Sequence, residues 1–284
     1  MTRPGPGGLR PPSDLAYVAA ERSARADGYA ERPSALPGAV VWTKTPAPPG
    51  APGGLGSFVW GRPDQGAVPG PASPAWPKRQ TLVLPDGCMD LLWSEGRLLV
   101  AGPDTRAFEP AGPPAHWAGL RFFPGTAPGY LAVPAHELRD RRVDLADLWP
   151  APAVRRLRDR VEAAPSAATA LEAAVLERAA ETGPPDPLLG ALVAALDAGR
   201  PVARTADALG LGARTLHRRA LAAFGYGPKT LARVLRLQRA LRLARAGVPY
   251  AACAARAGYA DQAHLARDVK ELAGQPLGRL LGGG

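Results

Sequence analysis

The chain has 284 residues, of which 46% are hydrophobic, so it is long enough for two globular domains with separate cores. Its two cysteines argue against a disulfide framework, and the lack of an apolar run of about 18 residues predicts a cytoplasmic protein with no membrane partner. Residues 200–284 hold 15 Lys and Arg against 4 Asp and Glu, whereas residues 1–199 hold 20 against 21. This charge distribution predicts that the C-terminal region binds phosphates of nucleic acid.

The first half of the chain is predicted to be rich in strands. Residues 1–28 have the composition of a flexible extension, with a short helix at residues 14–26. Residues 29–149 combine frequent prolines with short runs of Val, Leu and Trp, which is typical of strands and turns, and we interpret them as a sensor domain. The strands are expected at Ala39–Lys44, Gly56–Trp60, Gln80–Leu84, Met89–Ser94, Arg97–Ala101 and Trp117–Phe123.

Residues 150–185 change in character and are expected to form a helical linker. Their Ala, Leu and Val residues recur at helical spacing, which predicts helices at Ala151–Ala163 and Ser166–Glu181. The segment Thr182–Pro185 ends the second of these helices. Asp186 followed by Pro187 is the start signal of the next helix. The boundary of the last domain, residues 186–284, is therefore expected here.

The last domain contains one short motif twice, at Thr205–Arg219 and Cys253–Asp268. In both copies a small helical segment ends at a glycine, Gly210 or Gly258, and a second helical segment follows. This is the pattern of a helix-turn-helix unit. The predicted fold class is therefore multidomain, with a strand-rich (α+β) N-terminal domain followed by an all-α double helix-turn-helix domain. We expect this last domain to bind double-stranded DNA by itself.

The second helix of each unit supplies the candidate DNA contacts. These helices are expected at about residues 213–223, with Leu216 inward, and after the cap Asp261, with Leu265 inward. Arg can read guanine and Gln can read adenine through paired hydrogen bonds in the major groove. The predicted contact residues are Arg214, Thr215, His217, Arg218, Gln262, Ala263, His264 and Arg267.

A long connector helix is expected between the two units, at about residues 229–245. It carries an arginine at every third position from Arg233 to Arg245. At about 100° per residue this spacing spreads the five side chains over more than half of the helix circumference. The arginines therefore do not form one phosphate-facing stripe, and some of them are expected to be structural.

At this point the chain resembles the AraC/XylS family of bacterial transcription regulators, over about residues 186–281. The family's domain has two helix-turn-helix units bridged by a long helix, as the repeat also indicates. Ala220 and Val269 stand where the family usually carries Phe. The residues that carry the resemblance are Leu216–Arg218, Phe224–Pro228, Arg236–Ala240, Ala257–Asp261, Leu265–Arg267 and Gly274–Pro276.

The N-terminal half is similar to a domain that precedes this DNA-binding unit in many bacterial regulators, at Leu84–Trp93, Ala101–Thr105 and Gly119–Gly125. The wider resemblance implies effector sensing or dimerisation, with RNA polymerase as a partner if the protein is an activator. Aromatic side chains with one arginine as a polar anchor are typical of a pocket for a small organic effector, but the same aromatic residues are even more typical of the core of a small β domain. The candidate effector-binding residues are Trp42, Trp60, Cys88, Trp93 and Arg121.

Two other functions compete with a regulator, and no cofactor or metal is expected for the regulator. One is a DNA repair alkyl acceptor with Cys88 as its nucleophile, fused to the same DNA-binding domain. Such an acceptor needs an activated thiolate, and no Lys, Arg or His is adjacent to Cys88 in the sequence. The other is an architectural DNA-binding protein that has no sequence preference, which the salt dependence of binding would distinguish.

Overall fold

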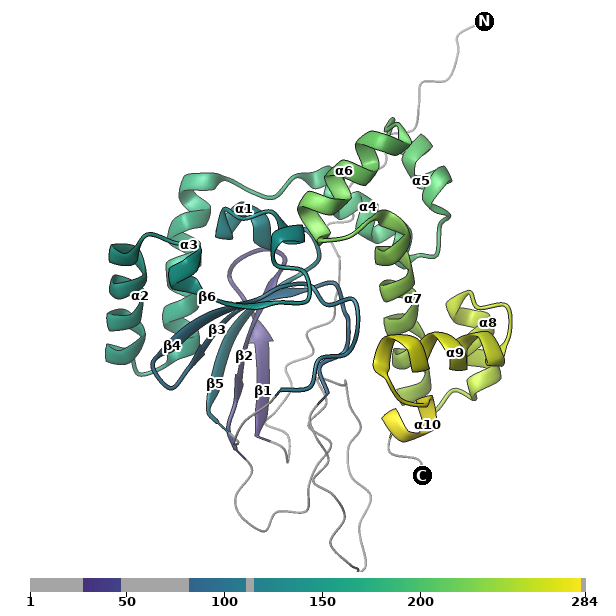
Figure 1. Ribbon diagram of the computed structural model, residues 1–284, viewed down its shortest axis with the longest axis horizontal. Helices are drawn as coiled ribbons and strands as arrows, with labels where there is room; N and C mark the ends of the chain where they lie inside the picture. Colours follow the sequence, from purple (N-terminus) through teal and green to yellow (C-terminus); the bar gives the residue numbers. More distant parts are fainter. Residues whose placement is uncertain (1–27, 47–81, 111–114, 282–284) are drawn as a thin grey trace, which may run out of the picture.

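The structure is a computed structural model that describes residues 28–46, 82–110 and 115–281. It has a sheet with three helices on one side of the molecule and a group of helices on the other (Figure 1). This arrangement confirms the predicted fold class. The N-terminal extension, the helix expected at residues 14–26 and the strand expected at Gly56–Trp60 lie outside the described residues.

The sheet has six antiparallel strands in the order β1-β2-β5-β3-β4-β6. Four of the predicted strands are present, and β5 ends one residue earlier than expected. The two edge strands, β1 and β6, were not predicted. Of the strand expected at Gln80–Leu84, the described part makes only a single bridge, between Val83 and Phe108. The strands are β1 (Tyr29–Pro33), β2 (Ala39–Lys44), β3 (Met89–Ser94), β4 (Arg97–Ala101), β5 (Trp117–Phe122) and β6 (Arg142–Asp144).

Side-chain alternation along these strands produces two different faces. Leu91 and Leu120 point toward helices α2 and α3, which cover the first face. Trp42 and Leu92 point to the second face and belong to a separate cluster. The helices of this part are α1 (Ala127–Leu131), the short 3-10 turns Ala135–Glu137 and Leu145–Asp147, α2 (Ala151–Ala163) and α3 (Ala167–Thr182).

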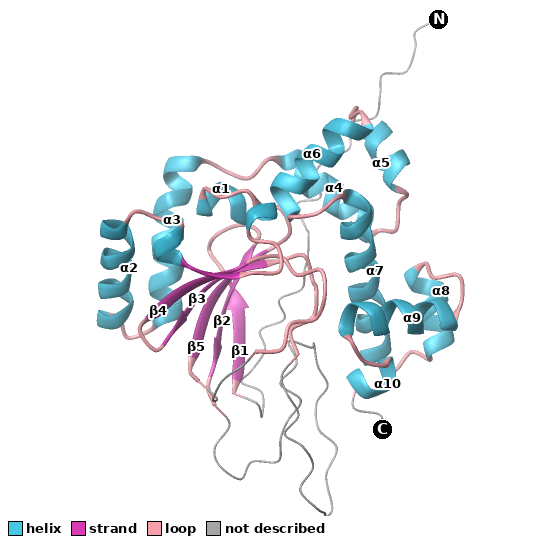
Figure 2. Cartoon of the chain, viewed as in Figure 1, coloured by secondary structure: helices cyan, strands magenta, loops and turns pink. Residues whose placement is uncertain are grey.

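Helix α2 has the bounds that the periodicity predicted and α3 begins and ends one residue later than predicted, but both pack as part of the sheet domain (Figure 2). Leu157 and Leu171 lie in the same core as the strands. The Glu172 carboxylate accepts hydrogen bonds from Ser34 and from the backbone of Ala35, and pairs with Arg32 at 2.6 Å. The segment expected to be a linker thus closes one face of the sheet, and the chain leaves the sheet domain only after α3.

The second part of the molecule is entirely helical. Asp186 accepts a hydrogen bond from the Leu188 N–H at 2.9 Å and caps the first of these helices, as its position before a proline predicted. The long helix α7 bridges the two halves of this part (Figure 1). The helices are α4 (Pro187–Asp197), α5 (Val202–Ala208), α6 (Ala213–Phe224), α7 (Pro228–Arg245), α8 (Tyr250–Ala257), α9 (Gln262–Ala273) and α10 (Leu277–Leu280).

Helix α7 contributes to two hydrophobic cores, one at each end. Leu231 packs with Leu216 and Phe224 in the first core. Leu241 packs with Leu265 and Val269 in the second core. Each unit therefore buries its second helix against a different part of the same helix, which makes α7 the common scaffold of both.

Candidate DNA-binding interface

Helix α6 presents a row of basic side chains to solvent. In the turn before this helix, Gly210 has a φ of +65°, a backbone conformation that residues other than glycine rarely adopt. Leu216 and Ala220 are buried, which leaves Arg214 and Arg218 exposed on the other side, as the spacing predicted. Thr215, at intermediate exposure, and His217, which is exposed, complete the predicted set on this helix. Both arginines are therefore on the solvent-facing side of the second helix of the first unit.

The His217 ring also contacts the start of the bridging helix. A Cβ atom added at Gly227 would come within 2.9 Å of the ring. The imidazole therefore lies against the first turn of α7, although its residue remains exposed. This contact ties the middle of α6 to the helix that holds both units.

Helix α9 presents a less basic surface. The Asp261 side chain accepts a hydrogen bond from the His264 N–H at 2.6 Å and caps the helix, as predicted. Gln262, Ala263 and Arg267 are exposed. The His264 ring, in contrast, packs edge-on against the Tyr259 ring at 5.1 Å, and its Nδ1 accepts a hydrogen bond from the Ala260 N–H at 3.4 Å. The imidazole of His264 thus helps to form the turn.

Four of the connector arginines bind other parts of the helical domain, as the spread of their positions suggested. Arg233 pairs with Asp268 and Glu271, and Arg236 lies 4.4 Å from the centre of the Tyr259 ring. Arg239 donates hydrogen bonds to the carbonyl oxygens of Asp197 and Ala257, and Arg242 pairs with Asp197 at 3.3 Å. These contacts hold α7 to α4, α8 and α9. Sequence reasoning did not find the partner carboxylates, because they lie about 35 to 45 positions away along the chain.

The candidate effector residues do not all come together. Trp42 donates a hydrogen bond from Nε1 to Asp90 at 2.8 Å, and Arg121 pairs with the same carboxylate at 3.2 Å. Trp93 lies on the opposite face of the sheet, where it packs against the core under α2 and α3. It therefore cannot share a pocket with Trp42, which corrects the expectation that one pocket includes both. Trp60 lies outside the described residues.

Cys88 is buried next to this charged cluster. Its backbone N–H donates to Asp86 at 2.8 Å. Burial raises the pKa of the Cys88 thiol, and the Asp86 carboxylate raises it further, although Arg121 acts in the opposite direction. A buried thiol with a raised pKa is a poor nucleophile, since the thiolate is the reactive form. This environment opposes the alkyl-acceptor alternative.

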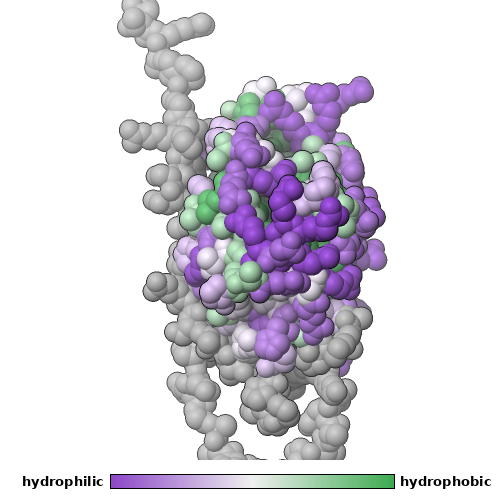
Figure 3. Space-filling model, turned by 90° about the vertical axis from the view of Figure 1, so that its left-hand side faces the viewer, coloured by the Kyte–Doolittle hydropathy of each residue, from purple (hydrophilic) through white to green (hydrophobic). Residues whose placement is uncertain are grey.

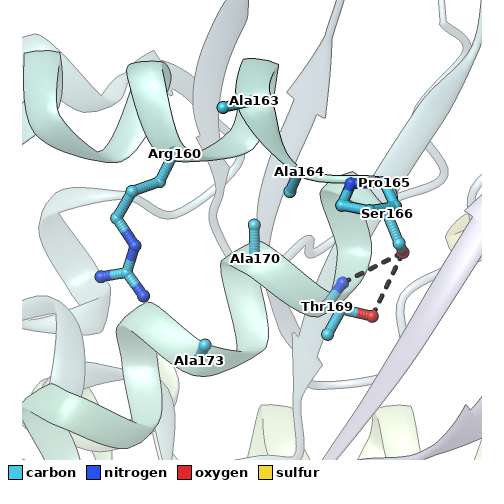
Figure 4. A pocket seen from close by; sticks show the side chains of 8 residues that line it. All are labelled: Arg160, Ala163, Ala164, Pro165, Ser166, Thr169, Ala170 and Ala173. Carbon is cyan, nitrogen blue, oxygen red and sulfur yellow. Dashed lines mark hydrogen bonds between the residues drawn. The ribbon is translucent and has the colours of Figure 1, made fainter.

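The groove between α2 and α3 does not resemble an effector site (Figure 4). Short alanine side chains make up half of its lining, and its polar groups already have partners. Arg160 forms two hydrogen bonds with Glu177, and Ser166 caps α3 through the Thr169 N–H. The outward surface on this side of the molecule is mostly hydrophilic (Figure 3). Exposed charged residues of α2 contribute to it, namely Arg155, Arg156, Asp159, Arg160 and Glu162.

Two family models match the chain. Residues 71–144 match a domain of unknown function (DUF6597), and residues 205–282 match a helix-turn-helix domain family. The second match begins in α5 and runs through both predicted units. The C-terminal part is an AraC-type helix-turn-helix domain. The resemblance to the AraC/XylS family is thereby confirmed, and the AraC-type domain supports a DNA-binding transcriptional regulator.

The solved structures similar to this chain are distant. Two structures of ToxT from Vibrio cholerae have a TM-score of 0.40 and 8% identity, and cover 71% of this chain and 94% and 93% of their own. A substituted apo form of ToxT has a TM-score of 0.36 and 10% identity over 70% of this chain and 87% of its own. These similarities are too weak to carry an inference about function. No curated protein matches the chain significantly.

The AraC-type domain has smaller side chains than its family usually carries at two positions, and both positions lie in hydrophobic cores. Ala220 and Val269, where Phe is usual, are completely buried.

None of the helices in the described residues has both the length and the apolar character needed to span a membrane. Within those same ranges, no three His, Cys, Asp or Glu side chains gather into a group that could hold a metal ion.

Proposed function

We propose that this protein is a sequence-specific transcriptional regulator that reads two adjacent major-groove segments of DNA with α6 and α9. The observation that carries the proposal is the exposure of Arg214, Arg218, Gln262 and Arg267 on two helices bound to one scaffold, α7. The excess of basic over acidic residues in the same part of the chain would attract the phosphates. The domain that does this work is proposed to be residues 186–284, after a boundary at residues 183–185.

The side chains differ in what each would contribute. Arg214, Arg218 and Arg267 offer paired donors to guanine, and Gln262 offers a donor and an acceptor to adenine. Ala263 is small enough to let a thymine methyl group approach. Thr215, His217 and His264 are proposed to contact the phosphate backbone and so to position the protein on the DNA. The rings of His217 and His264 also have contacts within the protein, which leaves them less free to reach base edges.

For the N-terminal part we propose a sensor role, controlled by a small organic effector or by pairing with a second copy of the chain. The largely buried cluster of Trp42, Asp90 and Arg121 on the second face of the sheet supports an effector, because it combines an aromatic ring with charged groups. If the protein activates transcription, RNA polymerase would be its further partner. An effector can change DNA affinity only to the extent that it prefers one arrangement of the protein.

Selection of bound fragments from random duplex DNA tests the proposal directly. The full chain should enrich one sequence with two half-sites about 10 base pairs apart, centre to centre, on one face of the duplex. Anisotropy titrations of that sequence and of a scrambled duplex over a range of salt should show a preference that persists as salt rises. Equal affinity for both duplexes would support an architectural protein. A folded chain that binds no DNA at low salt would refute the proposal.

A further inference from the structure

Two loops of the sheet domain run along the DNA-binding domain, and we call them together the strap, residues 82–88 and 103–108. They lie on either side of the β3–β4 hairpin in the sequence and between the sheet and α7 in space (Figure 1). Val83 and Phe108 join the two loops through a pair of backbone hydrogen bonds, each of 2.8 Å. The strap therefore consists of two loops of the sheet domain that one β-bridge holds together.

The strap is built into the second helix-turn-helix unit. Leu84 is only 4% exposed and belongs to the same hydrophobic core as Leu241 and Leu265. The Ala107 N–H donates a hydrogen bond of 2.7 Å to the carbonyl oxygen of Leu272. That carbonyl is in the last turn of α9, where the helix itself offers no partner. The N-terminal domain thus completes both the core and the C-terminal end of the second recognition helix.

The strap also contacts the bridging helix at its middle. Gln238, a buried residue of α7, donates from Nε2 to the carbonyl oxygen of Pro85 at 2.6 Å. A buried polar group needs such a partner, since leaving it unpaired is costly. The side chain of Gln238 therefore binds the strap, and it is buried away from any surface that DNA would contact.

The first helix-turn-helix unit meets the strap where α6 ends and α7 begins. The Tyr226 side chain is 2% exposed, with its hydroxyl beside Gly87. Gly225 has a φ of +81°, and a Cβ there would come within 2.6 Å of Pro103. Arg139, outside the strap, donates to the Gly225 carbonyl oxygen at 3.4 Å. The sheet domain approaches this joint so closely that only glycine fits.

We propose that the strap is a positioning element for DNA recognition, and that Leu84, Ala107 and Gln238 are positioning residues. The strap contacts both units at once, so it sets the angle and separation between α6 and α9. Two recognition helices can bind adjacent major-groove segments together only if they are about one helical turn of DNA apart. The exposed faces of both helices remain uncovered, so the strap aligns them without blocking them. This inference rests on the proposed function.

One consequence concerns the isolated domain. The fragment 186–284 lacks Leu84 and Ala107, and its Gln238 loses the carbonyl of Pro85. The charge distribution alone predicts that this fragment binds DNA. Because the fragment lacks the strap contacts, we further predict that it binds single half-sites but does not have the strict preference of the full chain for one spacing between them.

The test uses the full chain and three duplexes derived from its selected sequence. One carries both half-sites at the natural spacing, one has both half-sites separated by about 5 additional base pairs, and one has a single half-site. The variants are Leu84→Ala and Gln238→Leu, and the matched control is Leu98→Ala in the sheet core under α2 and α3. Dissociation constants are measured for each protein on each duplex.

The strap variants should bind the single half-site within about twofold of the unsubstituted chain but lose about 10-fold of the preference for natural spacing, a typical size for coupling between sites. The control should keep that preference. A spacing preference that is unchanged in Gln238→Leu, or lost equally in Leu98→Ala, would overturn the positioning role. If Leu84→Ala does not fold, Gln238→Leu decides. Failure of the unsubstituted chain to prefer any sequence would instead refute the proposed function.

Discussion

Arg233 of the bridging helix α7 donates a hydrogen bond from Nε to Asp268 of the second recognition helix α9. The same carboxylate accepts the Tyr259 hydroxyl at 2.8 Å and lies 3.6 Å from the Arg236 guanidinium. Asp268 is only 5% exposed, and a buried carboxylate is tolerated when its partners satisfy it in this way. The network pairs Arg233 and Arg236 of α7 within the protein, and it fixes α9 against α7.

Replacement of Asp268 should therefore be much more damaging than replacement of Glu271, although both pair with Arg233. Asp268→Ala leaves the Tyr259 hydroxyl and the two arginines without their carboxylate. We expect a loss of about 3 kcal/mol in the free energy of unfolding, at the low end for a broken buried pair because the arginines stay partly solvated. Glu271→Ala removes an exposed partner and should change stability far less. Urea denaturation of both variants measures the difference, and equal losses would contradict the network's role.

The arginines of the recognition helices should affect binding and leave stability unchanged. Arg214→Ala, Arg218→Ala and Arg267→Ala are each expected to weaken binding to the selected sequence by about 1–3 kcal/mol if they read bases. Arg97→Ala, an exposed arginine at the start of β4, is the control and should have no effect. Anisotropy titrations on selected and scrambled duplexes compare them. An arginine whose loss weakens both equally contacts phosphate and does not read a base.

The thiols should be protected in the native protein. Burial raises the pKa of both Cys88 and Cys253, so little thiolate is present near neutral pH. Iodoacetamide at about pH 7.5 should modify both residues far more slowly than free cysteine, and rapidly once guanidinium unfolds the chain. Mass spectrometry of the peptides gives the two rates separately. Rapid alkylation of native Cys88 would restore the alkyl-acceptor alternative.

The contacts of Glu172 in α3 with Arg32 and with the β1–β2 loop should make the free energy of unfolding depend on pH. Burial alone would raise the pKa of Glu172, but hydrogen bonds from Arg32, Ser34 and the Ala35 N–H outweigh it and lower that pKa. A lowered carboxyl pKa stabilises the fold fully above the unfolded-state value of about 4.3, and this stabilisation is lost as pH falls through the folded-state value.

The Glu172→Gln variant cannot lose this contribution. Its melting temperature should therefore fall less than that of the unsubstituted chain between about pH 6 and about pH 3. Glu162→Gln, at an exposed position of α2, is the control. If the melting temperatures of Glu172→Gln and of the unsubstituted chain fall by the same amount over this pH range, the contacts of Glu172 do not lower the pKa of its carboxyl group.

Local sequence signals were sufficient for most elements of this fold. The bounds of β2, β3, β4 and α2 agree with the prediction, because alternation, helical spacing and turn residues act over a few neighbouring positions. The caps Asp186 and Asp261 are local for the same reason. Strands β1 and β6 were not predicted, and both lie at the edges of the sheet. Their pairing depends on strands that other parts of the chain supply.

The repeat and the charge distribution were likewise enough to predict a double helix-turn-helix domain. Which side chains of that domain face solvent follows from helical periodicity, so the exposure of Arg214 and Arg218 was predictable. The partners of Arg233 and Gln238 were not, because a single sequence carries no record of contacts between distant positions. The opposite placement of Trp42 and Trp93 likewise depends on the register of strands that are remote from each other in the sequence.

Local sequence patterns were therefore enough to specify the kind of DNA-binding domain and its helices, whereas long-range packing established how the two domains meet. Packing of α2 and α3 on the sheet, and of the strap on α7 and α9, depends on the shape and polarity of surfaces that form only after each part has folded. Such surfaces join residues from far apart in the chain, so no local pattern encodes them.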